Sequence, residues 1–155
     1  METVNKQQEI WRLNREISQL NNKITILLNS KIKYEEDIRK YSSDLSKVIS
    51  INDKISEVSN KNITINEIIK KGSFNISDAI LGESRQAFTS NYLRINSKNS
   101  EIIGVAKSNI NKTIEDINNK INSIKVSLNS NNTEINIIKR EISNKNYELY
   151  LLRGY

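Results

Sequence analysis

Apolar residues recur at alternating spacings of three and four along the first half of the chain. The series consists of Ile10, Leu13, Ile17, Leu20, Ile24, Leu27, Tyr34, Ile38, Tyr41, Leu45, Val48 and Ile55. Such heptad spacing is typical of a helix that packs along a narrow seam, whereas a half-buried strand would alternate at every second residue. The pattern therefore predicts one long helix over about residues 5–70.

The second half of the chain repeats the same spacing. Its series consists of Ile110, Ile114, Ile117, Ile121, Ile124, Leu128, Ile135, Ile138, Ile142, Leu149 and Leu152. Absence of proline favours uninterrupted helix, because proline removes a backbone donor and clashes with the preceding turn. We predict a second long helix over about residues 85–152, which ends at Gly154.

Some seam positions are polar, and the spacing is less regular in two places. Lys31 and Asn52 fall on the seam, where a polar residue fixes the register or extends its polar end to solvent. Beyond residue 55 the apolar residues follow less regularly, so we expect a stutter or a break over 58–62. The Asn-rich stretch 129–132 is a second place where we expect the helix to be distorted.

The region 71–84, between the two series, contains two of the four glycines, Gly72 and Gly82. Glycine tolerates a positive φ and ends helices at low cost, so a chain reversal is expected here. Folding at about residue 76 would bring Ile17 near Ile135 and Ile24 near Leu128. The prediction is an all-α fold: a long antiparallel helical hairpin, coiled-coil-like, forming a single domain over 1–155. A short extra helix near the turn is left open.

Several large apolar residues lie off the seam. A two-stranded seam does not need them, whereas an arrangement of three or four helices needs a wider apolar stripe. We therefore expect the hairpin to pack against helices of a partner or of its own copy, and the alternative is single exposed apolar side chains. For Trp11 the alternative is partial packing against the C-terminal end of the second helix, near Tyr147, Tyr150 and Leu151. The predicted contacts are Trp11, Leu28, Ile32, Val105, Val126 and Ile137.

Composition narrows the classes of function. The chain has no cysteine and no histidine, and no glycine-rich phosphate loop or nucleophile motif, so we expect no enzyme, no cofactor and no metal. The net charge is +6, yet Lys and Arg are scattered among Asp and Glu, which disfavours nucleic acid as a partner. No apolar run approaches the roughly 18–20 residues of a membrane span. The first residues lack the apolar core of a signal peptide, so we expect a cytoplasmic protein.

The stretch Ile80-Leu81-Gly82-Glu83-Ser84-Arg85-Gln86-Ala87-Phe88 resembles a family signature. It is similar to the turn of small helical W-x-G proteins and their YwqH-like relatives, which accompany LXG toxins of bacterial type VII secretion. Ile80 stands where tryptophan is usual, Gly82 matches the glycine, and Phe88 matches the aromatic residue of the next helix. The abundance of Asn, Lys and Ile suits an AT-rich genome, such as that of a low-GC Gram-positive bacterium.

The resemblance implies a helical hairpin without catalytic activity. Ile80, Gly82 and Phe88 would shape the turn, with Phe88 packing beneath it. The chain would act as a chaperone or targeting factor that binds the helical N-terminal domain of a larger LXG-type toxin, together with a second small helical helper, and promotes its export. The chain would then stay in the cytoplasm or leave with its partner. The alternative is a self-associating coiled-coil protein, a homo-oligomeric spacer or phage component, without an export role.

Overall fold

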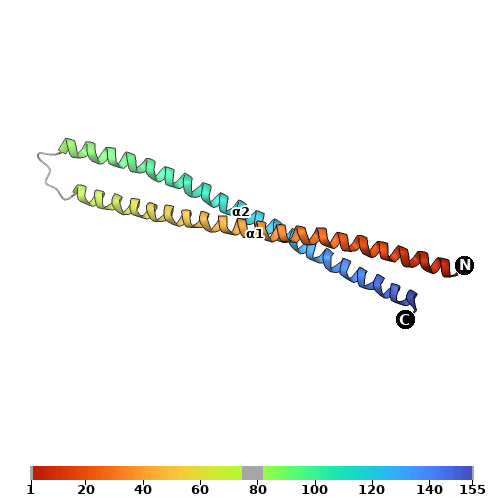
Figure 1. The fold of residues 1–155 in the computed structure, drawn as a ribbon. Helices are drawn as coiled ribbons and strands as arrows, with labels where there is room; N and C mark the ends of the chain where they lie inside the picture. The colour runs from red at the N-terminus through yellow and green to blue at the C-terminus, as the bar shows by residue number, and fades with distance from the viewer. Residues whose placement is uncertain (1, 75–81, 155) are drawn as a thin grey trace. The chain divides into compact units, whose positions relative to one another are not determined.

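Two long α-helices make up the described chain. The computed structural model describes residues 2–74 and 82–154 (Figure 1). Helix α1 spans Glu2–Phe74 and helix α2 spans Gly82–Arg153. This confirms the predicted all-α helical hairpin. Both helices extend into the predicted turn region 71–84, and each is a few residues longer than the predicted arm.

Neither helix is interrupted where the sequence suggested a break. α1 continues through 58–62 and α2 continues through 129–132, and the described residues contain no third helix. Polar side chains in these stretches bond along their own helix: the Thr64 hydroxyl donates to the Asn60 carbonyl at 3.1 Å, and that of Thr133 to the Asn129 carbonyl at 3.0 Å. A hydroxyl satisfied in this way does not compete for the helical backbone bonds, so low helix propensity alone does not break the helix.

The end of α2 follows the sequence prediction. Gly154 has a φ of 77°, and its N–H donates to the Leu151 carbonyl at 3.3 Å. A glycine in the left-handed region after the last helical residue is a common helix stop, because it has no Cβ to clash. Arg153 places a positive charge on the last turn, where the helix dipole is negative.

The hairpin divides into two compact units, and each contains a stretch of both helices. Unit 1 comprises residues 1–42 and 120–155, and unit 2 comprises residues 43–119. Each unit is described separately below.

Unit 1 contains all the buried apolar side chains of the described chain, and they come from the predicted seam. These side chains are Leu13, Ile121, Ile135, Ile138 and Leu149. The seam residues between them, such as Ile17 and Ile24, are partly buried. The predicted heptad series therefore forms the core of this unit.

The register between the helices in unit 1 differs from the prediction. The Asn131 side-chain amide donates to the Leu27 carbonyl at 3.1 Å, and the Lys145 ammonium lies 2.6 Å from the Glu16 carboxylate. These contacts place Ile135 at the level of Ile24, where the prediction had placed Leu128. The shift is one heptad, about 10 Å along the helix. A slip of seven residues leaves the same side chains on the seam, so the pattern alone does not distinguish the two registers.

Unit 2 keeps the heptad phase but has a polar seam near its middle. The partly buried positions of α1 continue through Asn52, Ile55, Ser59, Asn62 and Asn66 without a stutter. The Asn62 amide donates to the Ser100 hydroxyl of α2 at 3.3 Å. The described part of this unit has one buried side chain, that of Asn96, which is polar.

Candidate partner-binding surfaces

The six side chains predicted to contact a partner are all exposed. Their exposed fractions range from 42% for Leu28 to 69% for Val126. Exposure is compatible with the predicted role but does not by itself establish it, because isolated apolar residues are common on surfaces. Val105 belongs to unit 2, and the other five belong to unit 1.

The five predicted contacts in unit 1 do not form one face. Lys23 and Glu134 each precede a seam isoleucine, and their side chains form an ion pair at 2.7 Å. The residues that precede these seam isoleucines therefore lie on one side of the hairpin, and Ile137 is on this side by its heptad position. By the same phase, Leu28 and Ile32 lie on the opposite side of the unit.

Trp11 is exposed over most of its side chain, which is compatible with partial packing against the C-terminal end of α2. It is 65% exposed, and the Arg15 guanidinium lies 5.5 Å from the centre of its ring, one helical turn along α1. The adjacent seam positions are taken by Leu13 and Leu149, which are both buried. The rings of Trp11 and of Tyr147 therefore remain mostly in solvent.

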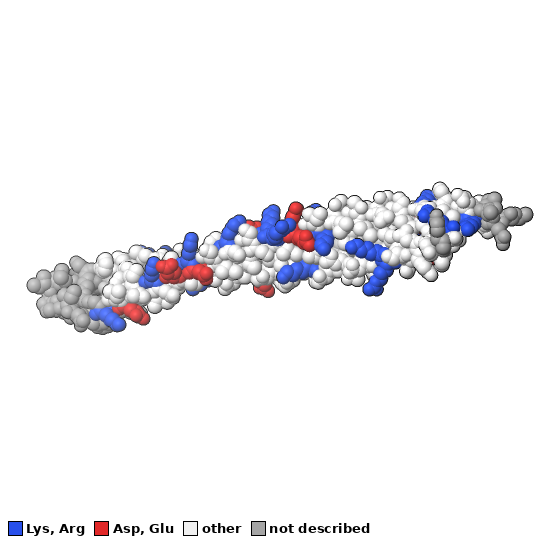
Figure 2. Space-filling view, turned by 60° about the horizontal axis from the view of Figure 1, so that its bottom comes forward, with Lys and Arg blue, Asp and Glu red and all other residues white. Residues whose placement is uncertain are grey.

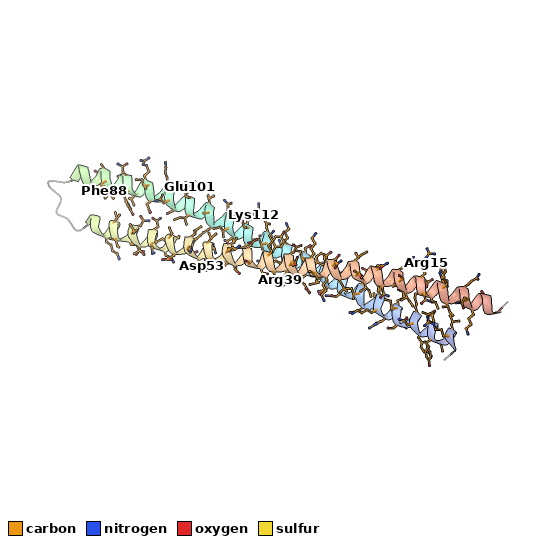
Figure 3. All side chains as sticks on the ribbon, viewed as in Figure 1. Arg15, Arg39, Asp53, Phe88, Glu101 and Lys112 are labelled. Carbon is orange, nitrogen blue, oxygen red and sulfur yellow. The ribbon has the colours of Figure 1, made fainter. Side chains whose placement is uncertain are left out.

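The structure bears on two of the three residues predicted to shape the turn. Ile80 lies outside the described residues. Gly82 is the first residue of α2; its φ is not positive, and a Cβ there would meet nothing within 4 Å. The turn beneath which Phe88 is predicted to pack lies outside the described residues. Phe88 is 65% exposed and stacks on Tyr92, with ring centres 6.5 Å apart (Figure 3).

A wider apolar surface, which the sequence analysis missed, lies in unit 2. On α1 the exposed residues Ile51, Val58 and Ile65 recur every seven positions, each just before a seam residue. On α2 the exposed residues Phe88, Ile95 and Ile102 recur every seven positions as well. We call this set, with Ile68, the unit 2 apolar face. Its members are Ile51, Val58, Ile65, Ile68, Phe88, Ile95 and Ile102.

These seven residues lie on one side of unit 2. In an antiparallel pair, the positions that precede the first seam position of each heptad lie on the same side in both helices. On α2, Tyr92 and Ala106 occupy two of the positions that precede the first seam position, and both are partly buried. Phe88 contacts Tyr92 directly. Ile95 and Ile102 follow Phe88 along the same helical column, beside Tyr92 and Ala106. The apolar stripes of α1 and α2 therefore flank the same side of the seam.

The seam beneath this face contains polar side chains whose hydrogen-bonding groups lack partners. The side-chain oxygens of Asn66 and Asn96 are buried and have no hydrogen-bond partner in the described structure. Burying an amide oxygen without a partner costs free energy, and the apolar side chains that would stabilise the unit from within point outward instead. Unit 2 therefore exposes apolar side chains on one outer side and contains buried polar side chains near the middle of its seam.

The corresponding side of unit 1 is charged. Lys145 bonds to Glu16, which lowers the pKa of the Glu16 carboxyl and raises that of the Lys145 ammonium. Arg12 bonds to Glu9 and lowers the pKa of that carboxyl. A groove on this side is bordered by the small side chains Ser30, Ser127 and Ser130. The ion pairs are solvent-accessible, so each contributes little to stability.

The described residues contain neither a candidate metal site nor a candidate membrane-spanning helix. Over 2–74 and 82–154, no group of three or more Asp or Glu side chains is placed to hold a metal ion. Neither α1 nor α2 has, within its described residues, the length and apolar character that a bilayer crossing requires. Charged side chains on the face shown in Figure 2 are scattered among wide uncharged areas.

In comparisons with known proteins, no family model, curated protein or solved structure matches this chain.

Proposed function

We propose that this chain is a non-catalytic helper that binds the helical N-terminal domain of an LXG-type toxin and promotes its export by type VII secretion. The unit 2 apolar face is the observation that carries the proposal. Seven large apolar side chains on one side of two helices are exposed to water in the single chain. An apolar patch of this size on a soluble protein marks an interaction surface.

The nature of the surface favours a helical partner. Its residues are spaced by seven on both helices, so the surface runs parallel to the hairpin and suits the apolar face of another helix. The resemblance of residues 80–88 to the turn of W-x-G and YwqH-like proteins supports the toxin domain as that partner. A helper of this kind would cover the partner's apolar side before export.

Co-expression tests this function. The chain is produced together with the helical N-terminal domain of the toxin encoded in the adjacent reading frame, and the product is analysed by size-exclusion chromatography with light scattering. We expect a stable complex containing both chains, with a dissociation constant of about 1 μM or lower. The control is the same toxin domain with an unrelated helical hairpin.

Two outcomes contradict the proposal. One is a chain that stays monomeric and does not bind the toxin domain. The other is a homo-oligomer whose mass does not change when the toxin domain is added, which would support the self-associating coiled-coil alternative.

A further inference from the structure

We propose that the unit 2 apolar face is the docking surface for one amphipathic α-helix whose polar flanks carry carboxylates. The inference rests on the proposed function, because it assigns the surface and the chemistry of the partner's helix. It differs from the sequence prediction, which had distributed the contacts over Trp11, Leu28, Ile32, Val105, Val126 and Ile137.

The area of the face is sufficient for stable binding. Its seven side chains are between 46% and 65% exposed. With roughly 100 Å² of accessible surface on each, they present on the order of 700 Å², close to the roughly 800 Å² that one side of a standard interface buries. A single helix of three to four heptads would cover a surface of this length.

The edges of the face are basic. Lys47, Lys54 and Lys61 precede Ile68 in the same helical column of α1 and form one edge, and all three are exposed. On α2, Lys98 and Lys112 flank Val105 at heptad spacing and form the other edge. Lys98 and Val105 also border a shallow hollow, together with Glu101 and Ile102.

Most of these lysines are not neutralised within the chain. Lys47 pairs with Asp44 at 3.0 Å, and Lys61 pairs with Glu57 at 2.7 Å. Among the described residues, no ion pair involves Lys54, Lys98 or Lys112. Carboxylates on both flanks of a docked helix would meet these three ammonium groups, which favours an acidic partner.

The same charges disfavour a second copy of this chain as the occupant. Both edges of the face carry lysines, so two copies that pair face to face by a twofold axis bring lysine edges together. Like charges placed opposite each other across an interface cost free energy and select against that pairing. The observations therefore favour a different, acidic helix.

Because part of its seam is polar, unit 2 should become more ordered when a helix docks on its apolar face. With polar side chains in part of its seam and a row of apolar ones outside, the unit gains further apolar burial when the face is covered. Docking of a helix should therefore slow amide hydrogen exchange over residues 51–68 and 88–105.

A pair of designed peptides tests the inference on the full chain. Both have four heptads with Ile and Leu on the seam positions. One carries Glu at the flanking positions, which also prevents self-pairing at neutral pH, and the other carries Lys there. Binding is measured by fluorescence anisotropy. We expect the Glu-flanked peptide to bind about tenfold or more tightly than the Lys-flanked peptide, with weaker binding at high salt.

Variants of the chain locate the site. Ile65→Asp and Ile102→Asp should each weaken binding of the Glu-flanked peptide by about tenfold or more. Ile63→Asp is the matched control, because Ile63 lies on the opposite side of α1 and is 55% exposed, against 46% for Ile65. It should change the affinity by less than about threefold. Circular dichroism establishes that all variants are equally helical.

Four other results would overturn the inference, and a fifth would overturn only the proposed function. Equal binding of both peptides excludes acidic recognition, and equal effects of Ile65→Asp and Ile63→Asp exclude this face as the site. A homodimer that Ile65→Asp dissociates makes a second copy the occupant. If the toxin domain still binds the chain with both Ile65→Asp and Ile102→Asp, the helper function stands and this docking surface is wrong. If the chain binds the Glu-flanked peptide but not the toxin domain, the surface stands and the helper function is wrong.

Discussion

At the residue scale, Leu13 is the most deeply buried side chain of the described structure, at 1% exposure. It lies on the seam of unit 1, whereas Ile26, also on α1, is 66% exposed. The two side chains have nearly the same volume and hydrophobicity, so their heptad positions alone separate a core residue from a surface residue.

Truncation of these two residues should therefore have unequal effects. We expect Leu13→Ala to destabilise the protein by about 2–4 kcal/mol, because it removes buried methyl groups and leaves a cavity. Ile26→Ala should cost less than about 0.5 kcal/mol. Urea denaturation followed by circular dichroism measures both. Equal losses would mean that unit 1 does not pack on the predicted seam.

A second residue-scale prediction concerns the bond between Glu16 and Lys145. The bond holds the pKa of Glu16 below its ordinary value, so its contribution is present above pH about 4.5 and is lost as the pH falls through the lowered value. It holds the pKa of Lys145 above its ordinary value, so the contribution is complete below pH about 10 and is lost as the pH rises further.

The melting temperature should therefore be nearly constant between these limits and fall beyond each. Glu16→Gln should flatten the part of the acid-side fall that is due to this bond. Since the pair is partly exposed, its effect at neutral pH should be small, and Lys6→Gln on the same helix serves as the control. An acid-side profile that is identical in wild type and Glu16→Gln would contradict the assignment.

At the element scale, the register of α1 against α2 is the property that the heptad pattern leaves undecided. The ion pair between Lys23 and Glu134, at 2.7 Å, distinguishes one register from the other. A slip to the register expected from the sequence would bring Glu134 level with Glu16 and place like charges together, whereas the Asn131 amide would meet another main-chain carbonyl in either register.

Cysteine crosslinking distinguishes the two registers. We expect the pair Ile24→Cys and Ile135→Cys to form a disulfide readily under mild oxidation, because the two positions lie at the same level of the seam. The pair Ile17→Cys and Ile135→Cys lies one heptad apart in this register, about 10 Å, and should not crosslink. Crosslinking of the second pair in preference to the first would restore the register expected from the sequence.

At the scale of the whole molecule, apolar burial is unequal between the two units. All the buried apolar side chains of the described chain belong to unit 1. Buried side-chain oxygens without partners occur at Asn66 and Asn96 in unit 2 and at Asn131 in unit 1. Stability within one protein follows such differences in apolar burial and in unsatisfied polar groups.

Hydrogen exchange should reflect this difference in the chain alone. We expect amides of unit 2 over residues 56–69 and 89–103 to exchange about tenfold or more faster than those of unit 1 over residues 13–27 and 121–138. Mass spectrometry of peptic fragments measures both sets in one experiment. Equal protection of the two sets would show that the polar seam of unit 2 carries no energetic penalty.

The sequence by itself determined the two helices, their seam and the helix stop at Gly154, because each depends on local spacing and on the chemistry of single residues. It also indicated that apolar side chains remain outside the seam. It does not locate the largest exposed apolar surface, since the spacing of Val58, Ile65 and Ile68 by itself suggests a break in the heptad pattern. The continuous heptad phase of α1 instead places Ser59, Asn62 and Asn66 on the seam and leaves the isoleucines outside.

Only the tertiary structure decided which residues face each other across the seam and which exposed residues of the two helices share a side. A sevenfold pattern is unchanged by a slip of seven residues, so the pairing of Ile24 with Ile135 had to come from contacts between the helices, such as that of Asn131 with Leu27. The unit 2 apolar face likewise combines stripes far apart in the chain, and only the packing of α1 against α2 sets them side by side.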